Sequence, residues 1–77
     1  MNPAIQDIAA RELTRRQHTI WQLHHQTGFS FRRIAIHLDL SRTTVTDHYD
    51  AACRKLRAHG VHVTPDGTHY LQNGEHP

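Results

Sequence analysis

Two helix-like segments separated by only a few residues constrain the fold of this chain more than any other feature. The first follows Ser30, a residue type that caps helix N-termini, and places Ile34, Ala35 and Leu38 on one face. The second follows Ser41, a further cap of the same kind. Because the connection is so short, the two predicted helices must be direct neighbours in the fold.

The segment after Ser41 predicts the longer of the two helices. Its apolar residues recur at intervals of four, three and four, which is the spacing of one helix face. The predicted inward residues are Val45, Tyr49, Ala52 and Leu56. His48 and Cys53 flank this side, and His59-Gly60 ends the helix.

The connection Leu38-Asp39-Leu40-Ser41 completes a helix-turn-helix pattern over residues 30–59. Ala35 is small where the second helix packs closely. Such a turn takes a positive φ and normally holds glycine, and Asp39 tolerates that conformation better than most residues. Ile36 has no place on the inward face. The apolar positions that share a core with the preceding helix are Ile34, Leu38, Leu40 and Val45.

Two further helices are predicted before this motif. Asn2-Pro3 combines a cap with proline at the first helical position and predicts a helix over residues 3–11. Thr14 and Gln17 have capping-box spacing and open the next helix, which should stop near Thr27-Gly28 because glycine closes helices readily. The core residues expected here are Ile20, Leu23, either Trp21 or His24, and Phe29 or Phe31.

The end of the chain predicts a β-hairpin over residues 61–71. Two segments with period-two alternation flank Pro65-Asp66-Gly67, which supplies turn chemistry. Three roles are open: a wing along DNA, an edge that pairs with a second copy, or a lid over the core. The lid would use Val61, Val63, Tyr70 and Leu71. The hairpin has no Lys or Arg, which argues against a phosphate-binding wing and favours packing or dimerisation.

These elements predict one mainly α domain over residues 1–77, a bundle of three to four helices with a C-terminal hairpin. A chain this short buries only about 60% of its unfolded surface, so little room is left for an enclosed active site. The sequence also shows no nucleophile–base pair and no phosphate loop, and we expect no enzyme.

Cys53, the one cysteine, has no disulfide partner. Without a signal peptide or membrane-spanning run, we expect a cytoplasmic protein.

Positive charge is concentrated in the helical part of the chain. All nine Lys and Arg residues lie between Arg11 and Arg57, where four acidic residues oppose them and leave a net charge of +5. Such a segment attracts a polyanion, most commonly nucleic acid.

The nine histidines are scattered, so we expect no metal and no cofactor. Histidines that gain protons below about pH 6.5 would strengthen the attraction to DNA.

One set of positions carries a family resemblance over residues 13–57. The residues are Leu13-Thr14-Arg15-Arg16-Gln17, Gly28-Phe29-Ser30, Ile34-Ala35, Leu38, Leu40-Ser41, Thr44-Val45, His48 and Arg54-Lys55-Leu56. This pattern resembles the LuxR-type helix-turn-helix and the related promoter-reading region four of bacterial sigma factors. The resemblance implies that the last helix enters the DNA major groove, and that His48 is buried.

The resemblance also assigns candidate DNA-binding residues. Those on the outward, N-terminal part of the last helix are Ser41, Arg42, Thr43, Thr46 and Asp47. Their chemistry agrees, because Arg bonds guanine bidentately, Thr offers a hydroxyl and a methyl group, and Asp accepts from cytosine. Thr44 is a candidate for a phosphate contact. Arg32 and Arg33 are expected at the DNA backbone, and further candidates are Arg15, Arg16, Arg54 and Arg57.

The sequence thus predicts a sequence-specific transcriptional regulator of bacterial or phage origin whose partner is double-stranded DNA. A lone motif makes few base contacts, so we expect a homodimer on half-sites about 34–36 Å apart, or a partner protein. Two alternatives stay open. One is a sigma-like adaptor that binds RNA polymerase or another protein, and the other is a phage recombination or packaging accessory protein.

Overall fold

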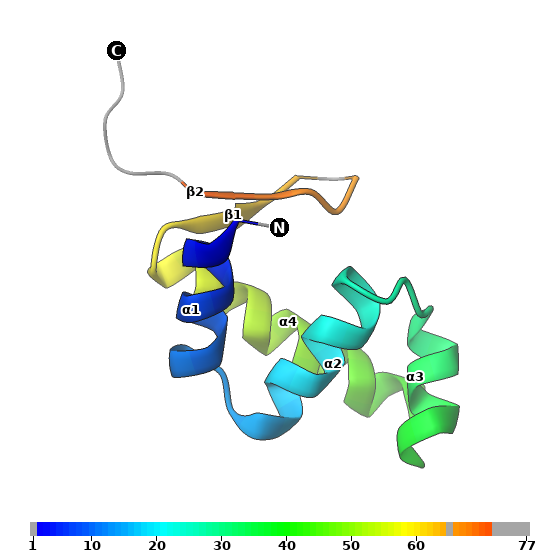
Figure 1. Cartoon of the computed structure of the whole chain (residues 1–77). Helices are drawn as coiled ribbons and strands as arrows, with labels where there is room; N and C mark the ends of the chain where they lie inside the picture. Colours follow the sequence, from blue (N-terminus) through cyan, green and yellow to red (C-terminus); the bar gives the residue numbers. More distant parts are fainter. Residues whose placement is uncertain (1, 65, 72–77) are drawn as a thin grey trace.

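A computed structural model describes residues 2–64 and 66–71 and shows four helices followed by a two-stranded hairpin (Figure 1). The elements are α1 (Pro3–Glu12), α2 (Arg15–His25), α3 (Phe31–Leu38), α4 (Arg42–Ala58), β1 (Val61–Val63) and β2 (His69–Leu71). The predicted mainly α fold with a C-terminal hairpin is confirmed. Pro65, expected in the turn, lies outside the described residues.

Each helix begins where its capping residue predicts. The Asn2 side chain accepts a hydrogen bond from the Ala4 amide (2.8 Å), and the Ser30 side chain accepts one from the Arg33 amide (3.1 Å). Thr14 and Gln17 form both bonds of the capping box. These bonds satisfy amides that have no partner within the helix, which is why the starting points can be predicted from the local sequence.

The turn between α3 and α4 has the predicted geometry. Asp39 adopts the left-handed conformation, with φ 56° and ψ 49°. The Leu40 amide then bonds to the Ala35 carbonyl over 2.9 Å and closes α3. This backbone reversal brings the first turn of α4 next to the end of α3.

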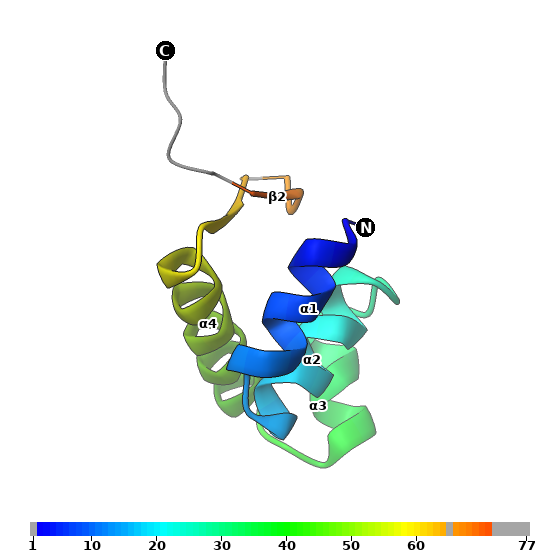
Figure 2. The same cartoon turned by 60° about the vertical axis from the view of Figure 1, so that its left-hand side comes forward.

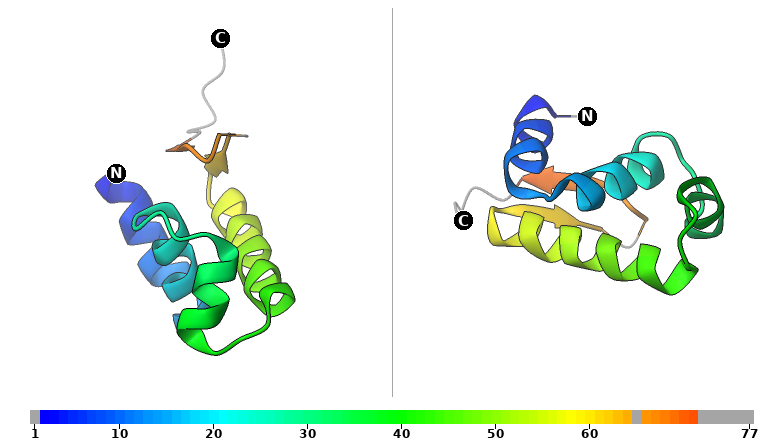
Figure 3. Two further views of the ribbon diagram at one scale, coloured as in Figure 1. Left: turned by 90° about the vertical axis from the view of Figure 1, so that its right-hand side faces the viewer. Right: turned by 90° about the horizontal axis from the view of Figure 1, so that it is seen from below.

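Helix α4 is the central element and packs against α1, α2, α3 and β1. Figures 2 and 3 show α3 at one end of the molecule and the hairpin, with the start of α1, at the other. The buried side chains form two clusters. The helix-turn-helix core contains Ile20, Ile34, Ala35 and Val45, and the cap core contains Ile5, Ala9, Leu13, Trp21, Ala52, Leu56 and Val61. Tyr49 packs against both cores and connects them.

The hairpin corrects one prediction. Val61 is fully buried and Val63 half-buried, as expected of a lid, but Tyr70 and Leu71 remain 45% and 36% exposed. Tyr70 and Leu71 are adjacent in a strand, so they point to opposite faces and cannot both cover the core. In the observed register, Val63 pairs with His69 and His62 with Tyr70. His69 therefore occupies the inward place, and Tyr70 stacks on His62 outside (5.4 Å between ring centroids).

Several core predictions also need adjustment. His48, expected to be buried, is only partly so. In α2, both Ile20 and Trp21 are fully buried, and Gln17 joins them, whereas Leu23 and His24 are half-buried. Phe29 and Phe31 are half-buried; like Leu38 and Leu40, they pack against the helix-turn-helix core from its rim. Ile36 is 74% exposed, as its place outside the inward face predicts.

None of the described helices is long and apolar enough to cross a membrane.

Candidate nucleic-acid interface

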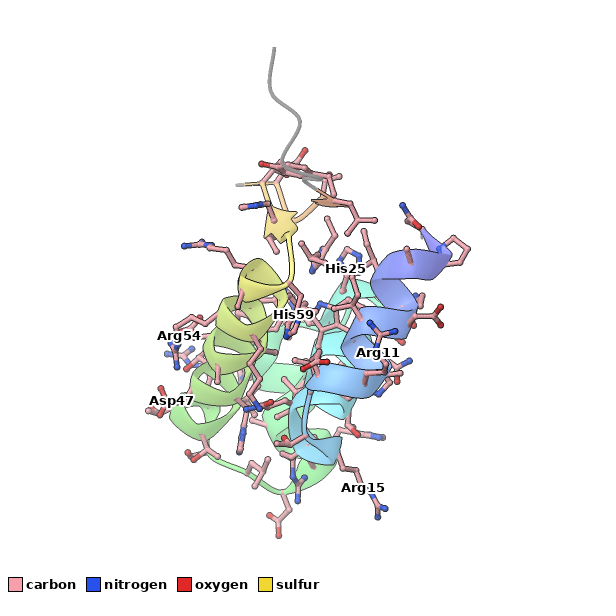
Figure 4. All side chains as sticks on the ribbon, turned by 90° about the vertical axis from the view of Figure 1, so that its left-hand side faces the viewer. Arg11, Arg15, His25, Asp47, Arg54 and His59 are labelled. Carbon is pink, nitrogen blue, oxygen red and sulfur yellow. The ribbon has the colours of Figure 1, made fainter. Side chains whose placement is uncertain are left out.

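The outer side of α4 is a continuous exposed stripe. Val45, Ala52 and Leu56 fix the opposite side of the helix in the two cores. The exposed residues of the stripe are Arg42, Thr43, Asp47, Asp50, Arg54 and Arg57. Figure 4 shows Asp47 and Arg54 on the outer side of α4, pointing away from the other helices.

Hydroxyl groups around the first turn of α4 are partly committed to the helix itself. The Ser41 hydroxyl accepts from the Thr44 amide (3.0 Å) and donates to the Thr44 hydroxyl (2.7 Å). The Thr46 hydroxyl donates to the carbonyls of Thr43 (2.9 Å) and Arg42 (3.2 Å). Thr46 therefore presents its methyl group and an acceptor oxygen, and its proton is already used. Sequence spacing predicted the Ser41 cap bond to the Thr44 amide but not the bonds of the Thr46 hydroxyl.

Two side chains in the same turn are free to bind a ligand. Within the part of the chain that the structure describes, the Arg42 guanidinium and the Thr43 hydroxyl have no hydrogen-bond or ion-pair partner. Both residues are exposed. The structure thus groups Ser41, Arg42, Thr43 and Thr46 at one end of α4. Arg54 lies about 18 Å further along the helix axis, since each residue adds about 1.5 Å, and does not belong to this group.

The arginines of α2 and α3 are also exposed. Arg32 and Arg33 lie in the first turn of α3, and the Arg33 guanidinium sits 4.0 Å above the centre of the Phe29 ring. This cation–π contact, which the sequence did not predict, holds Arg33 in one place. Arg15 and Arg16, with Thr19 and Leu38, line a hollow of about 420 Å³ between α2 and α3. Because Leu38 ends α3, this hollow adjoins the α3–α4 turn; Figure 4 shows Arg15 at that end of the molecule.

Two carboxylates interrupt the positive charge along α4. Asp47 and Asp50 are exposed between Arg42 and Arg54. Among the described residues, the one salt-bridge contact joins Glu12 to His59 (3.0 Å) and is an ion pair only when the histidine is protonated, so no arginine neutralises either aspartate directly. The charge pattern favours anion contact at the first turn of α4 and opposes it one turn later.

Two ionisable side chains of α4, Tyr49 and Cys53, are partly buried. Burial raises the pKa of the Cys53 thiol and that of the neighbouring Tyr49 hydroxyl, so both groups stay protonated near neutral pH. In the ranges 2–64 and 66–71, no group of three or more His, Cys, Asp or Glu residues is placed to hold a metal ion. The exposed groups of α4 are suited to binding by hydrogen bonds and charge.

Comparison with known protein families agrees with this arrangement. The family model described as bacterial regulatory proteins, luxR family, matches residues 11–64, which is 54 of the 77 residues. The match spans the end of α1, all of α2, α3 and α4, and β1. Neither the curated proteins nor the solved structures gave a significant match. The chain belongs to the luxR family of bacterial regulatory proteins.

Proposed function

We propose that this protein is a sequence-specific DNA-binding transcriptional regulator of a bacterium or a phage, and that the start of α4 reads bases in the major groove. The observation that carries the proposal is the pair of exposed side chains Arg42 and Thr43 at the start of α4, which have no partner among the described residues, in a chain of the luxR family. A guanidinium in that position can bond bidentately to O6 and N7 of guanine. As a DNA-bound regulator, the protein would act in the cytoplasm.

The other candidate residues near the start of α4 divide between base and backbone roles. The Thr46 methyl group suits a contact with the thymine methyl, because the hydroxyl proton is used within the helix. Asp47 can accept from cytosine N4. Ser41 and Thr44 sit at the N-terminus of α4, where helix dipole and hydroxyls favour a phosphate. Each role follows from the chemistry of the side chain; Ser41 and Asp47 are exposed, whereas Thr44 and Thr46 are half-buried.

The arginines outside this turn suit phosphate contacts. Arg32 and Arg33 begin α3, and Arg15 and Arg16 begin α2; all four are exposed. We assign Arg54, which is further along α4, a secondary backbone contact. Replacement of a phosphate-contacting arginine by alanine should weaken binding to all sequences alike. It should also reduce the slope of the logarithm of the binding constant against the logarithm of salt concentration by about one.

Selection from a randomised duplex pool at about 150 mM salt tests the proposal, because non-specific attraction is weak there. We expect the wild type to enrich one sequence. Arg42→Ala should lose affinity for it by about 1–3 kcal/mol, roughly 5- to 150-fold, and relax the preference at one base pair. Arg11→Ala is the matched control, since it removes an exposed arginine from α1 and should preserve the enriched sequence.

Two results would contradict the proposal: no enrichment by the wild type, or equal affinity and preference in Arg42→Ala. The first result would make a protein partner, such as RNA polymerase, the principal target in place of DNA, and the second would show that Arg42 does not read the enriched sequence. The form of the enriched sequence also reports on assembly. A palindrome with half-sites about 34–36 Å apart indicates the homodimer we propose, and a single asymmetric site indicates a monomer assisted by a partner.

A further inference from the structure

One hydrogen bond ties the second strand of the hairpin to the helices. The Trp21 indole Nε1–H donates to Nε2 of His69 over 2.8 Å. Trp21 is fully buried in the cap core, and its N–H is a donor that needs an acceptor when it is buried. His69 supplies that acceptor from a position 48 residues later in the chain.

The geometry requires a neutral His69. Because Nε2 accepts from Trp21, the ring proton must sit on Nδ1, which lies 3.1 Å from the Gly67 carbonyl and can donate to it. Both ring nitrogens are then satisfied. In the protonated ring both nitrogens are donors, so Nε2–H would face the indole N–H and the bond would be lost.

The groups around His69 come from every neighbouring element. On α2, the ring centroid of His25 lies 3.7 Å from that of His69, and His24 adds a second titratable ring. On the hairpin turn, the Asp66 carboxylate accepts from the Thr68 amide (3.0 Å) and from the Thr64 hydroxyl. Asn2 and Gln26, which line the same hollow as His69, are uncharged, and so is Val63, its partner on β1. The charge of the N-terminal amino group also lowers the pKa of His25.

The balance of these groups opposes a positive charge on His69. Burial, and then the charge of His25, lower the pKa of His69 to about 4. Burial, and then His24, also lower the pKa of His25. A hollow of about 590 Å³, lined in part by His25, Thr68 and His69, gives protons access to the rings. His69 is thus half-buried, accessible, and bonded in a way that only its neutral form permits.

We propose that the Trp21–His69 hydrogen bond is an acid-sensitive latch that holds β2 against the helices and releases it when His69 gains a proton. The release is confined to β2 and the turn, since β1 is anchored by Val61 in the cap core. Ile34, Ala35 and Val45 lie in the other core, so α3 and the first turn of α4 stay in place. This inference does not rest on the proposed DNA contacts.

The sign of the effect follows from the two protonation states. A released His69 titrates near the ordinary value of 6.5, whereas the latched ring does so at about 4. The released form therefore binds more protons between these values. The stabilisation given by the latch is complete above about pH 6.5 and is lost as the pH falls to about 4.

The test follows the Trp21 indole N–H by ¹⁵N NMR on the full chain from pH 7.5 to 3.5, which is unambiguous because the chain has one tryptophan. We expect its protection from solvent exchange, corrected for intrinsic rates, to fall up to tenfold per pH unit between about pH 6.5 and 4. The amides of Ile34 and Val45 should stay protected over the same range. Unchanged indole protection down to pH 4, or simultaneous loss at Ile34 and Val45, would overturn the latch.

Two variants separate the latch from general acid effects. His69→Gln retains a side-chain acceptor that does not titrate, so the transition should disappear. His62→Gln is the matched control on β1, where the ring stacks on Tyr70 outside the cap core, and should leave the transition unchanged. A transition that persists in His69→Gln or disappears in His62→Gln would refute the assignment.

If His69→Gln does not fold, His25→Gln gives an independent answer. It removes the neighbouring charge that lowers the pKa of the latched ring, so that pKa moves back towards 6.5, and the fall in indole protection should be smaller and should end at a higher pH. A fall of unchanged size over an unchanged pH range would contradict the latch.

Discussion

The two ends of this molecule are stabilised in different ways. At the helix-turn-helix end, aliphatic side chains such as Ile34 and Val45 pack beneath helices that start at hydroxyl caps. At the cap end, the apolar cluster is supplemented by polar side-chain contacts, Trp21 with His69 and Glu12 with His59. The first end depends on packing, capping bonds and side-chain contacts between nearby segments, such as that of His24 with the Phe29 carbonyl (2.8 Å). The second end adds side-chain bonds between segments that lie far apart in the sequence.

Helices α2 and α4 are shared by both ends. Ile20 and Trp21 are adjacent in α2, yet one belongs to the helix-turn-helix core and the other to the cap core. In α4, Val45 serves the first core and Leu56 the second, with Tyr49 between them. The two ends are therefore expected to unfold together even though their contacts differ.

The largest expected effect tests that cooperativity by removing volume from one core at a time. Ile34→Ala and Leu56→Ala each delete a fully buried aliphatic side chain, and each should lower the free energy of unfolding by about 2–5 kcal/mol. Urea denaturation should show one transition for both variants, with its midpoint at a lower urea concentration. The slope of the unfolding free energy against urea concentration should be unchanged. Two separate transitions would show that the ends are independent units.

A smaller effect is expected from the helix caps, one at each end. Ser41→Ala and Asn2→Ala remove the caps of α4 and α1, and each should cost about 0.5–2 kcal/mol of stability by thermal or urea denaturation. Only Ser41→Ala should also weaken DNA binding, because α4 carries the proposed contacts. Ser41→Asn restores a capping acceptor and should recover stability. Equal loss of DNA affinity in Asn2→Ala would count against the proposed interface.

The smallest effect concerns the ion pair of the cap end. Glu12 and His59 join α1 to the end of α4, but their side chains remain 35% and 43% exposed. Glu12→Gln should therefore change the unfolding free energy by less than about 1 kcal/mol near neutral pH. Asp7→Asn, at an exposed acidic position in the same helix, is the matched control and should have no effect. A loss much above 1 kcal/mol would mean that the pair organises the cap end.

The sequence predicted local features better than contacts between distant segments. The starts of α2, α3 and α4 follow from Thr14, Ser30 and Ser41, because a cap bonds to an amide three residues away. The left-handed conformation of Asp39 was also predictable, since it belongs to the turn itself. These features need no knowledge of the rest of the fold.

Contacts across long separations were not predictable in the same way. The inward face of the hairpin depends on what lies beneath it, so His69, a polar residue in the sequence, was missed as the partner of Trp21. The cation–π contact of Arg33 with Phe29 depends on the loop path before α3. For the candidate interface, the sequence identified which residues are of a DNA-binding type, and the structure added which atoms are still free to bind.

Helix α4 has one further consequence, which is mechanical. It runs without a break for 17 residues, about 25 Å, from the first-turn residues at one end to the hairpin at the other. An uninterrupted helix of this length behaves as a stiff rod, so a tilt imposed on its last turn reappears at its first. A molecule that pulled on the hairpin would therefore also re-aim Arg42 and Thr43, without touching either of them.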